Sequence, residues 1–272
     1  MPVVRSVADA AYAVLATAHP ADKVKAARAA SRDWRAGRLA LIWDRAMPER
    51  PARPDRPELL PATRMPRRGK GGSAAGRIAM LHALAHIEFA AIDLAFDLIG
   101  RFGPLFPPAF LDDWFGVGAD EAMHFALLDR RLRALGSFYG AMPAHDGLWE
   151  AAGNTADDAL ARLAIVPMVL EARGLDVTPA TVARFAAAGD ATSARILGRI
   201  EKDEVRHVAA GVRWFLDLCG NRGFAPVPTW RRLVSERFGG TIKPPFNDSA
   251  REAAGLTKGY YTDLPNPPIV QH

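Results

Sequence analysis

Residues 202–211 read KDEVRHVAAG, and this stretch decides the fold that the sequence predicts. Glu204 and His207 lie three residues apart, so on a helix they share one face. The rest of that face is apolar at helical spacing, through Leu197, Ile200, Gly211, Trp214 and Leu218. The sequence therefore predicts a helix over about 190–219 that carries a carboxylate and an imidazole inside its core stripe.

The same pattern occurs once more, earlier in the chain. Residues 120–124 read DEAMH and place Glu121 and His124 on a predicted helix over about 108–135. A single Glu-x-x-His is common by chance and usually lies on a solvated face. Two of them on core stripes indicate a shared function.

Two further predicted helices each carry one glutamate inside an apolar stripe. Glu88 lies on a helix predicted over about 77–101, and Glu171 on one predicted over about 155–174. The order along the chain is therefore Glu, Glu-x-x-His, Glu, Glu-x-x-His. The third of these four helices is predicted to begin at Thr155, to kink at Pro167 and to end at Gly174.

The spacing of the two halves is constant. Glu88 and Glu171 are 83 residues apart, as are Glu121 and Glu204, and His124 and His207. Two helix pairs with the same residues at the same separation indicate a pseudo-two-fold bundle, joined by a long connection over about 136–154.

Electrostatics favours a metal site in that bundle. Four buried carboxylates without partners would each cost several kcal/mol or would have to bind protons. Two divalent cations balance four glutamates directly. Carboxylate-rich ligation with one imidazole per metal suits iron or manganese better than a structural zinc site, and it is the arrangement of di-iron helical bundles. The predicted ligands are Glu88, Glu121, His124, Glu171, Glu204 and His207.

Neighbouring residues receive weaker predictions. Asp120 and Asp203 are expected to orient the ligand histidines, and Arg206 either pairs with them or lies at the surface. His82 and His86 are expected at the surface, because they lie two positions off the Glu88 face.

Composition is ordinary for a globular protein, with 49% hydrophobic and 24% charged residues. The formal net charge of +5 is a mild excess and does not identify a nucleic-acid binder. The single cysteine, Cys219, excludes an internal disulfide and predicts a reducing, cytoplasmic location. The longest apolar stretch is interrupted by acidic residues, so no membrane span is expected.

The predicted fold class is all-α, because no stretch alternates convincingly enough for a sheet. Four segments are expected to form one structural domain. They are N-terminal accessory helices in 1–46, a Pro/Arg-rich arm in 47–76, a four-helix bundle in 77–219, and an irregular wrapping segment with one short helix in 220–272.

Several stretches carry a resemblance to known proteins. The DEVRH at 203–207 is similar to the D-E-x-R-H signature of the small subunit of class I ribonucleotide reductase and of bacterial multicomponent monooxygenases. HIEFAAIDLAFDLI, DEAMHFALLDRRL, YGAMPAHDGLWEAA and RLAIVPMVLEARGLDVTP extend the resemblance to a bacterial ferritin-like family of unknown function. The resemblance implies the same six metal ligands, with Glu121 and Glu204 as bridges. Met123 departs from the signature's arginine.

The predicted function is a non-haem dinuclear oxidoreductase that activates O2 or peroxide on a small molecule. Its cofactor would be two metal ions, iron or else manganese or a Mn/Fe pair, and it would need an electron donor. The first alternative is a ferroxidase or iron store. The second is an RNA-modifying hydroxylase, whose phosphate contacts would come from Arg50, Arg53, Arg56, Arg64, Arg67, Arg68 and Lys70.

Overall fold

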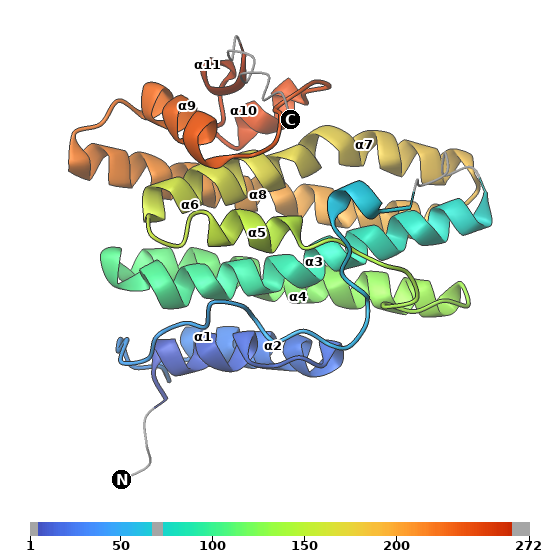
Figure 1. Cartoon of the computed structure of the whole chain (residues 1–272), viewed down its shortest axis with the longest axis horizontal. Coiled ribbons are helices and arrows are strands. Elements are labelled where there is room, and N and C mark those ends of the chain that lie inside the picture. The colour runs from blue at the N-terminus through green and yellow to red at the C-terminus, as the bar shows by residue number, and fades with distance from the viewer. Residues whose placement is uncertain (1–4, 67–72, 263–272) are drawn as a thin grey trace. The chain divides into compact units, whose positions relative to one another are not determined.

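The computed structural model describes residues 5–66 and 73–262, and these residues are all-α (Figure 1). Apart from two isolated β-bridges, the described residues form no extended strand pairing. The chain divides into two compact units. The first comprises residues 1–150 with 184–196, and the second comprises 151–183 with 197–272.

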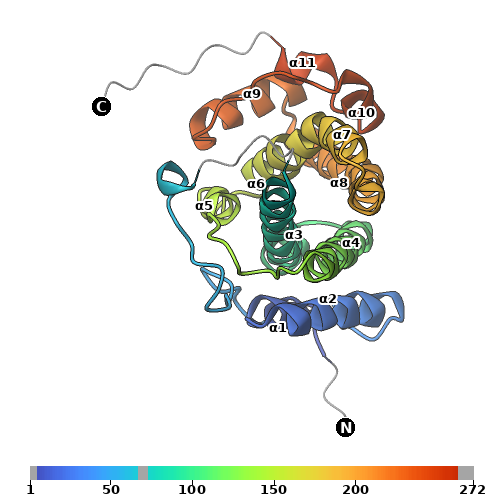
Figure 2. The same ribbon diagram turned by 90° about the vertical axis from the view of Figure 1, so that its right-hand side faces the viewer.

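Two helical layers form the first unit. Helices α3 and α4 pack along each other, and α1 and α2 cover them, with α1 against α3 and α2 against α4. Figure 2 shows these pairs nearly end-on, α1 and α2 below α3 and α4. The bounds are α1 Val7–Leu15, α2 Pro20–Arg35, α3 Ala74–Phe102 and α4 Pro108–Ala134, with short 3-10 turns η1 Ala62–Arg64 and η2 Gly103–Leu105.

Helix α3 is the core helix of this unit. Ser73 caps its N-terminus by accepting a hydrogen bond from the amide of Gly76, 3.1 Å away. Residues 88–100 are all buried, and they include three acidic residues, Glu88, Asp93 and Asp97, among the apolar ones. The segment Ala74–Leu105 is long and apolar enough to cross a bilayer, but 67% of its most apolar window is buried within the protein. That burial is consistent with a core helix of a soluble protein.

Residues 43–60, which we call the strap, run over this unit with no helix. Backbone hydrogen bonds hold the strap at its middle, from Ala52 to Leu15, and at its C-terminal end, between residues 58–60 and Ala144. Strap side chains pack closely against glycines of the unit. For example, Met47 occupies the space that a Cβ at Gly100 would need. Residues 47–60, which are part of the arm predicted over 47–76, contain no helix.

A buried ion-pair cluster fastens the strap to the helices. Asp93 of α3 is fully buried and pairs with Lys23 of α2 and Arg53 of the strap. Both cations also lie over the ring of Phe89, 5.3 and 5.6 Å from its centroid. Arg53 is thus used inside the unit. Arg67, Arg68 and Lys70, predicted to belong to a basic arm, lie outside the described residues.

The second unit is built around α6, the π-helix η3 that continues it, and α8. Trp230 of α9 donates a hydrogen bond to the carbonyl of Ala164, 3.1 Å away. A Cβ added at Gly211 of α8 would overlap the ring of Pro167 in η3, so glycine permits this close helix contact. Cys219, on α8, is completely buried. The bounds are α6 Ala159–Ile165, η3 Val166–Glu171, α9 Pro226–Arg237, α10 Asp248–Ala253 and α11 Lys258–Tyr261.

Three helices contain residues of both units: α5 Gly147–Gly153, α7 Ala172–Ala187 and α8 Ala191–Arg222. Helix α8 matches the prediction of about 190–219 closely. It begins after Asp190, whose carboxylate accepts a hydrogen bond from the amide of Ser193, 2.9 Å away. The connection over 136–154 contains α5.

The third predicted helix was wrong in its boundaries. Helix formation begins after Asp158, which caps the amide of Leu160, because Thr155 instead accepts a hydrogen bond from buried Arg162. Gly174 does not end it, since α7 continues to Ala187. The expected disturbance at Pro167 takes the form of η3.

The prediction for the tail was also wrong in part. Three helices, α9, α10 and α11, replace the one short helix expected beyond Gly220. The prolines that suggested loops include Pro226, at the first position of α9, where the missing amide hydrogen costs nothing.

Candidate metal centre

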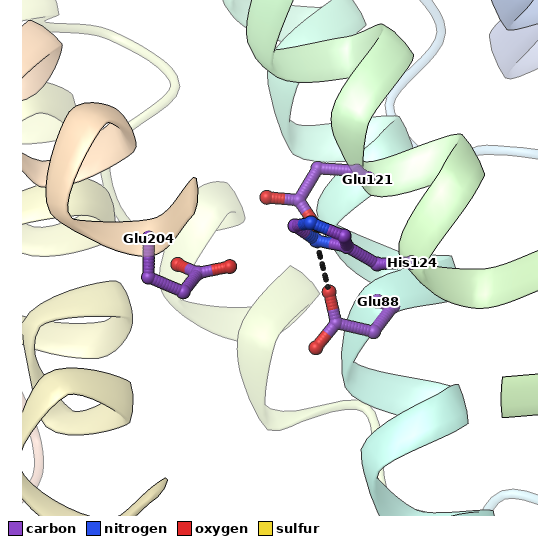
Figure 3. A group of neighbouring side chains, drawn as sticks. All are labelled: Glu88, Glu121, His124 and Glu204. Atoms are coloured by element: carbon purple, nitrogen blue, oxygen red, sulfur yellow. Dashed lines mark hydrogen bonds and ion pairs between the residues drawn. The ribbon is translucent and has the colours of Figure 1, made fainter. Parts of the chain in front are cut away.

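In the first unit, α3 and α4 bring three of the predicted ligands together. Glu88, Glu121 and His124 are 5%, 1% and 0% exposed. Figure 3 shows the imidazole of His124 directed at the two carboxylates. Its Nδ1 lies 3.2 Å from Oε2 of Glu88 and 3.5 Å from Oε2 of Glu121. One ligand atom from each residue lies within 4.8 Å of the others.

The protonation of His124 shows how strongly the carboxylates act on it. Burial disfavours the imidazolium, but hydrogen bonds to Glu121 and Glu88 outweigh burial and raise the pKa of His124 to about 11. Without a metal ion, this imidazole therefore carries a proton at neutral pH and partly balances the two acids. A bound metal ion would take the place of that proton.

Aromatic side chains lie beside this trio along the same helices. Phe89 follows Glu88, and Phe125 follows His124, with ring centroids 5.2 Å apart. Tyr139 closes the group, 5.3 Å from Phe89 and 5.0 Å from Phe125. Because the Phe89 ring also lies under the cations of Lys23 and Arg53, this aromatic group packs against the buried ion-pair cluster of the first unit.

His82 and His86 were predicted at the surface, and that prediction was wrong. They are 1% and 4% exposed. Nδ1 of His86 lies 2.9 Å from the hydroxyl of Tyr139, and Nε2 of His82 accepts a hydrogen bond from the amide of Gly140. The loop that covers them comes from residues 139–145, more than fifty positions away in sequence, so no local pattern could have shown it.

The second unit holds the other three predicted ligands. Glu204 and His207 lie on α8 and are 8% and 1% exposed, with Nδ1 of His207 3.5 Å from Oε1 of Glu204. Glu204 is also labelled in Figure 3. Glu171 is half-buried and is the last residue of η3. π-Helical turns inside α-helices are rare and frequently occur at functional sites.

The acid beside Glu204 is held by arginines. The two carboxylate oxygens of Asp203 accept hydrogen bonds from Arg199, at 2.6 Å, and Arg206, at 2.7 Å. Arg206 therefore pairs with Asp203 while remaining exposed. Asp120, its counterpart on α4, is half-buried. The roles of Asp120 and Asp203 in orienting ligand histidines stay predictions.

The donor chemistry and spacing of the first trio fit a metal ion. Carboxylate oxygens and imidazole nitrogens bind first-row divalent metals at about 2.0–2.2 Å, so two ligands at right angles lie about 3 Å apart. The distances of 3.2 and 3.5 Å from His124 are close to that value. Oxygen-rich ligation with one imidazole suits iron or manganese.

These features define a class of protein: an all-α chain with two buried Glu-x-x-His motifs, each with a further glutamate that repeats at the same offset. The chain belongs to the family described as "Protein of unknown function (DUF455)", whose model matches residues 16–262. It is 39% identical over 211 residues to a Haemophilus influenzae protein described as "Uncharacterized protein", over 75% of this chain and 73% of that one. No solved structure matches the chain.

Proposed function

We propose that the chain is a ferritin-like dinuclear-metal oxidoreductase that uses O2 or peroxide to oxidise a small molecule. The observation that carries the proposal is the repeated residue set: one glutamate and one Glu-x-x-His in each unit, always 83 residues apart. Helices α3 and α4, together with η3–α7 and α8, would form the four-helix bundle. The same ligand pattern is used by di-iron bundle proteins.

The chemistry of the six donors supports this choice. Four carboxylates and two imidazoles neutralise two divalent ions and leave each ion fewer than six fixed ligands when some glutamates bind through one oxygen. Two bound iron or manganese ions would supply the electrons that reduce O2 or peroxide.

The chain's own residues would prepare that site. Glu88 and Glu121 hold the imidazole of His124 in place, and His124 would have to be neutral to act as a metal ligand. The burial of Glu88, Glu121 and His124 would limit the access of water to the reacting atoms. The buried Cys219 is compatible with a reducing cytoplasm, which is the compartment we propose.

Elemental analysis of the purified protein tests the proposal. We expect about two metal ions per chain in the wild type and a large loss in both Glu121→Ala and Glu204→Ala, one variant for each unit. Glu58→Ala, which removes an exposed carboxylate of the strap, serves as the matched control and should keep both ions. Full occupancy in both ligand variants would contradict the assignment.

A further inference from the structure

A cavity of about 120 Å³ lies in the second unit beside the π-helix. Met168, Val169 and Leu170 of η3 line one side of it, directly before Glu171. Phe238, Ile242 and Phe246, from the tail, line another side. In another protein, an engineered apolar cavity of about 150 Å³ binds a benzene molecule. The cavity beside η3 therefore suits an apolar group of about one ring or a short acyl chain.

The charges that line this cavity are mostly positive. Three cations, Arg173, Lys243 and Arg251, face one acid, Asp176. Arg251 is nearly fully buried, and its Nε and Nη2 donate to the two oxygens of Asp176 at 2.8 and 2.7 Å. Arg251 and Asp176 thus neutralise each other, and two positive charges remain on the lining.

Arg173 is oriented but not saturated. Its Nη1 donates to the carbonyls of Lys243 and Pro245, at 2.9 and 3.0 Å, and lies 3.4 Å from Oδ2 of Asp176, which together fix the guanidinium in place. Its Nε and Nη2 donate no hydrogen bond to any described residue. These two groups form the planar fork that a carboxylate accepts through both oxygens. The ammonium of Lys243 makes no ion pair within residues 5–66 and 73–262.

We propose that this cavity binds a small carboxylic acid with an apolar body of about one ring. Its carboxylate would accept hydrogen bonds from Arg173 and from the ammonium of Lys243, while its body packs between η3 and the tail phenylalanines. Binding itself requires no metal ion. The additional inference that such acids are the substrates of the protein rests on the proposed function. It also rests on the position of Glu171, a predicted metal ligand that belongs to η3 as well.

Saturation-transfer NMR with benzoate and hexanoate tests the cavity directly on the full chain, as purified and again after treatment with a chelator. We expect both acids to bind in both preparations, and benzamide, which has the same ring without the charge, to bind at least tenfold more weakly. Loss of one charge-assisted hydrogen bond should weaken binding about tenfold or more. We therefore expect Lys243→Gln and Arg173→Gln each to bind benzoate about tenfold more weakly than the wild type, or weaker still.

Lys243→Gln is the cleaner variant, because the side chain of Lys243 is exposed and makes no hydrogen bond or ion pair within the described residues. Lys202→Gln, an exposed lysine of the same unit outside this cavity, is the matched control and should bind benzoate as the wild type does. Failure of both acids to bind, equal binding of benzamide, or unchanged affinity in Lys243→Gln would overturn the proposal. Metal content measured on the same preparations reports separately on the dinuclear centre.

Discussion

Asp93 shows what a single buried charge does in this protein. It draws Lys23 of α2 and Arg53 of the strap to one point on α3, so three segments distant in sequence share one ion-pair cluster. Breaking such a buried cluster by removing one partner is costly, because the remaining charges lose their compensation. The cluster therefore fixes where the strap lies on the first unit.

Replacing Lys23 with methionine should reveal that cost. We expect Lys23→Met to lower the free energy of unfolding by about 3 kcal/mol, since Asp93 would keep Arg53 but lose its fully buried partner. Urea unfolding followed by circular dichroism measures it. Lys25→Met, which removes an exposed lysine paired with Asp22, should cost less than about 1 kcal/mol. Equal losses in the two variants would contradict the importance of the buried cluster.

His86 should make stability depend on pH. Burial, reinforced by the charge of Arg53, lowers the pKa of His86 from 6.5 to about 4. The unfolded chain therefore binds a proton at this residue between those values while the folded chain does not, so stability is complete above pH 6.5 and is lost as the pH falls toward 4.

The matched variant isolates this effect. Between pH 7 and pH 4.5, in the presence of a chelator, the wild type should lose about 2 kcal/mol more stability than His86→Gln. Chemical unfolding at each pH gives the comparison. Parallel pH dependences for the two proteins would show that His86 does not titrate in this way.

At the scale of elements, the sequence predicted the long helices well. Helices α3, α4 and α8 follow the expected ranges within a few residues, because each is long and strongly periodic. The third helix was harder to predict, since Gly174 and Pro167 are usual helix breakers and here lie inside α7 and η3. Tertiary packing overrides these local preferences. Because that packing involves residues distant in the sequence, no local sequence pattern predicts it.

The candidate site was predictable only as a set of residues. The 83-residue repeat identified Glu88, Glu121 and His124, which the first unit brings together, and the pair Glu204 and His207 on α8. The surroundings were not predictable, because the loop over His86 and the ion pairs of Asp93 join segments that no short-range pattern connects. The π-helix that ends at Glu171 likewise has no sequence signature beyond Pro167.

Two glycines of α8 provide a test of helix packing. Gly211→Ala should destabilise the protein by about 1–3 kcal/mol, because the added Cβ would overlap the ring of Pro167. Gly198→Ala adds a methyl group in open space on the same helix. It should be neutral or stabilise by up to about 1 kcal/mol, through the higher helix propensity of alanine. Thermal unfolding of both variants measures the difference, and a stabilised Gly211→Ala would contradict the close contact.

At the scale of the whole molecule, the distinction to test is between an enzyme and an iron store, since both can use such a ligand set. Under the proposed function, the strap, the 136–154 connection and the tail helices would cover a substrate site, which a storage subunit does not need. We therefore expect the protein to retain about two irons per chain when many equivalents of ferrous iron are added in air. Its metal centre should return to the reduced state when an electron donor is supplied.

Iron analysis after gel filtration, with optical spectra before and after the donor, follows both properties. Retention of hundreds of irons per assembly as a soluble mineral would favour storage instead. A centre that stays near two irons but never returns to the reduced state would also exclude repeated turnover.

Cys219 makes it possible to measure how often the structure around α8 opens. It is the chain's one thiol, it is completely buried on α8, and burial raises its pKa, so the reactive thiolate is scarce while the second unit stays closed. A thiol reagent can therefore label Cys219 only after the structure around α8 has opened. The labelling rate counts those openings directly, without any engineered probe and without a second sulfhydryl to confuse the signal.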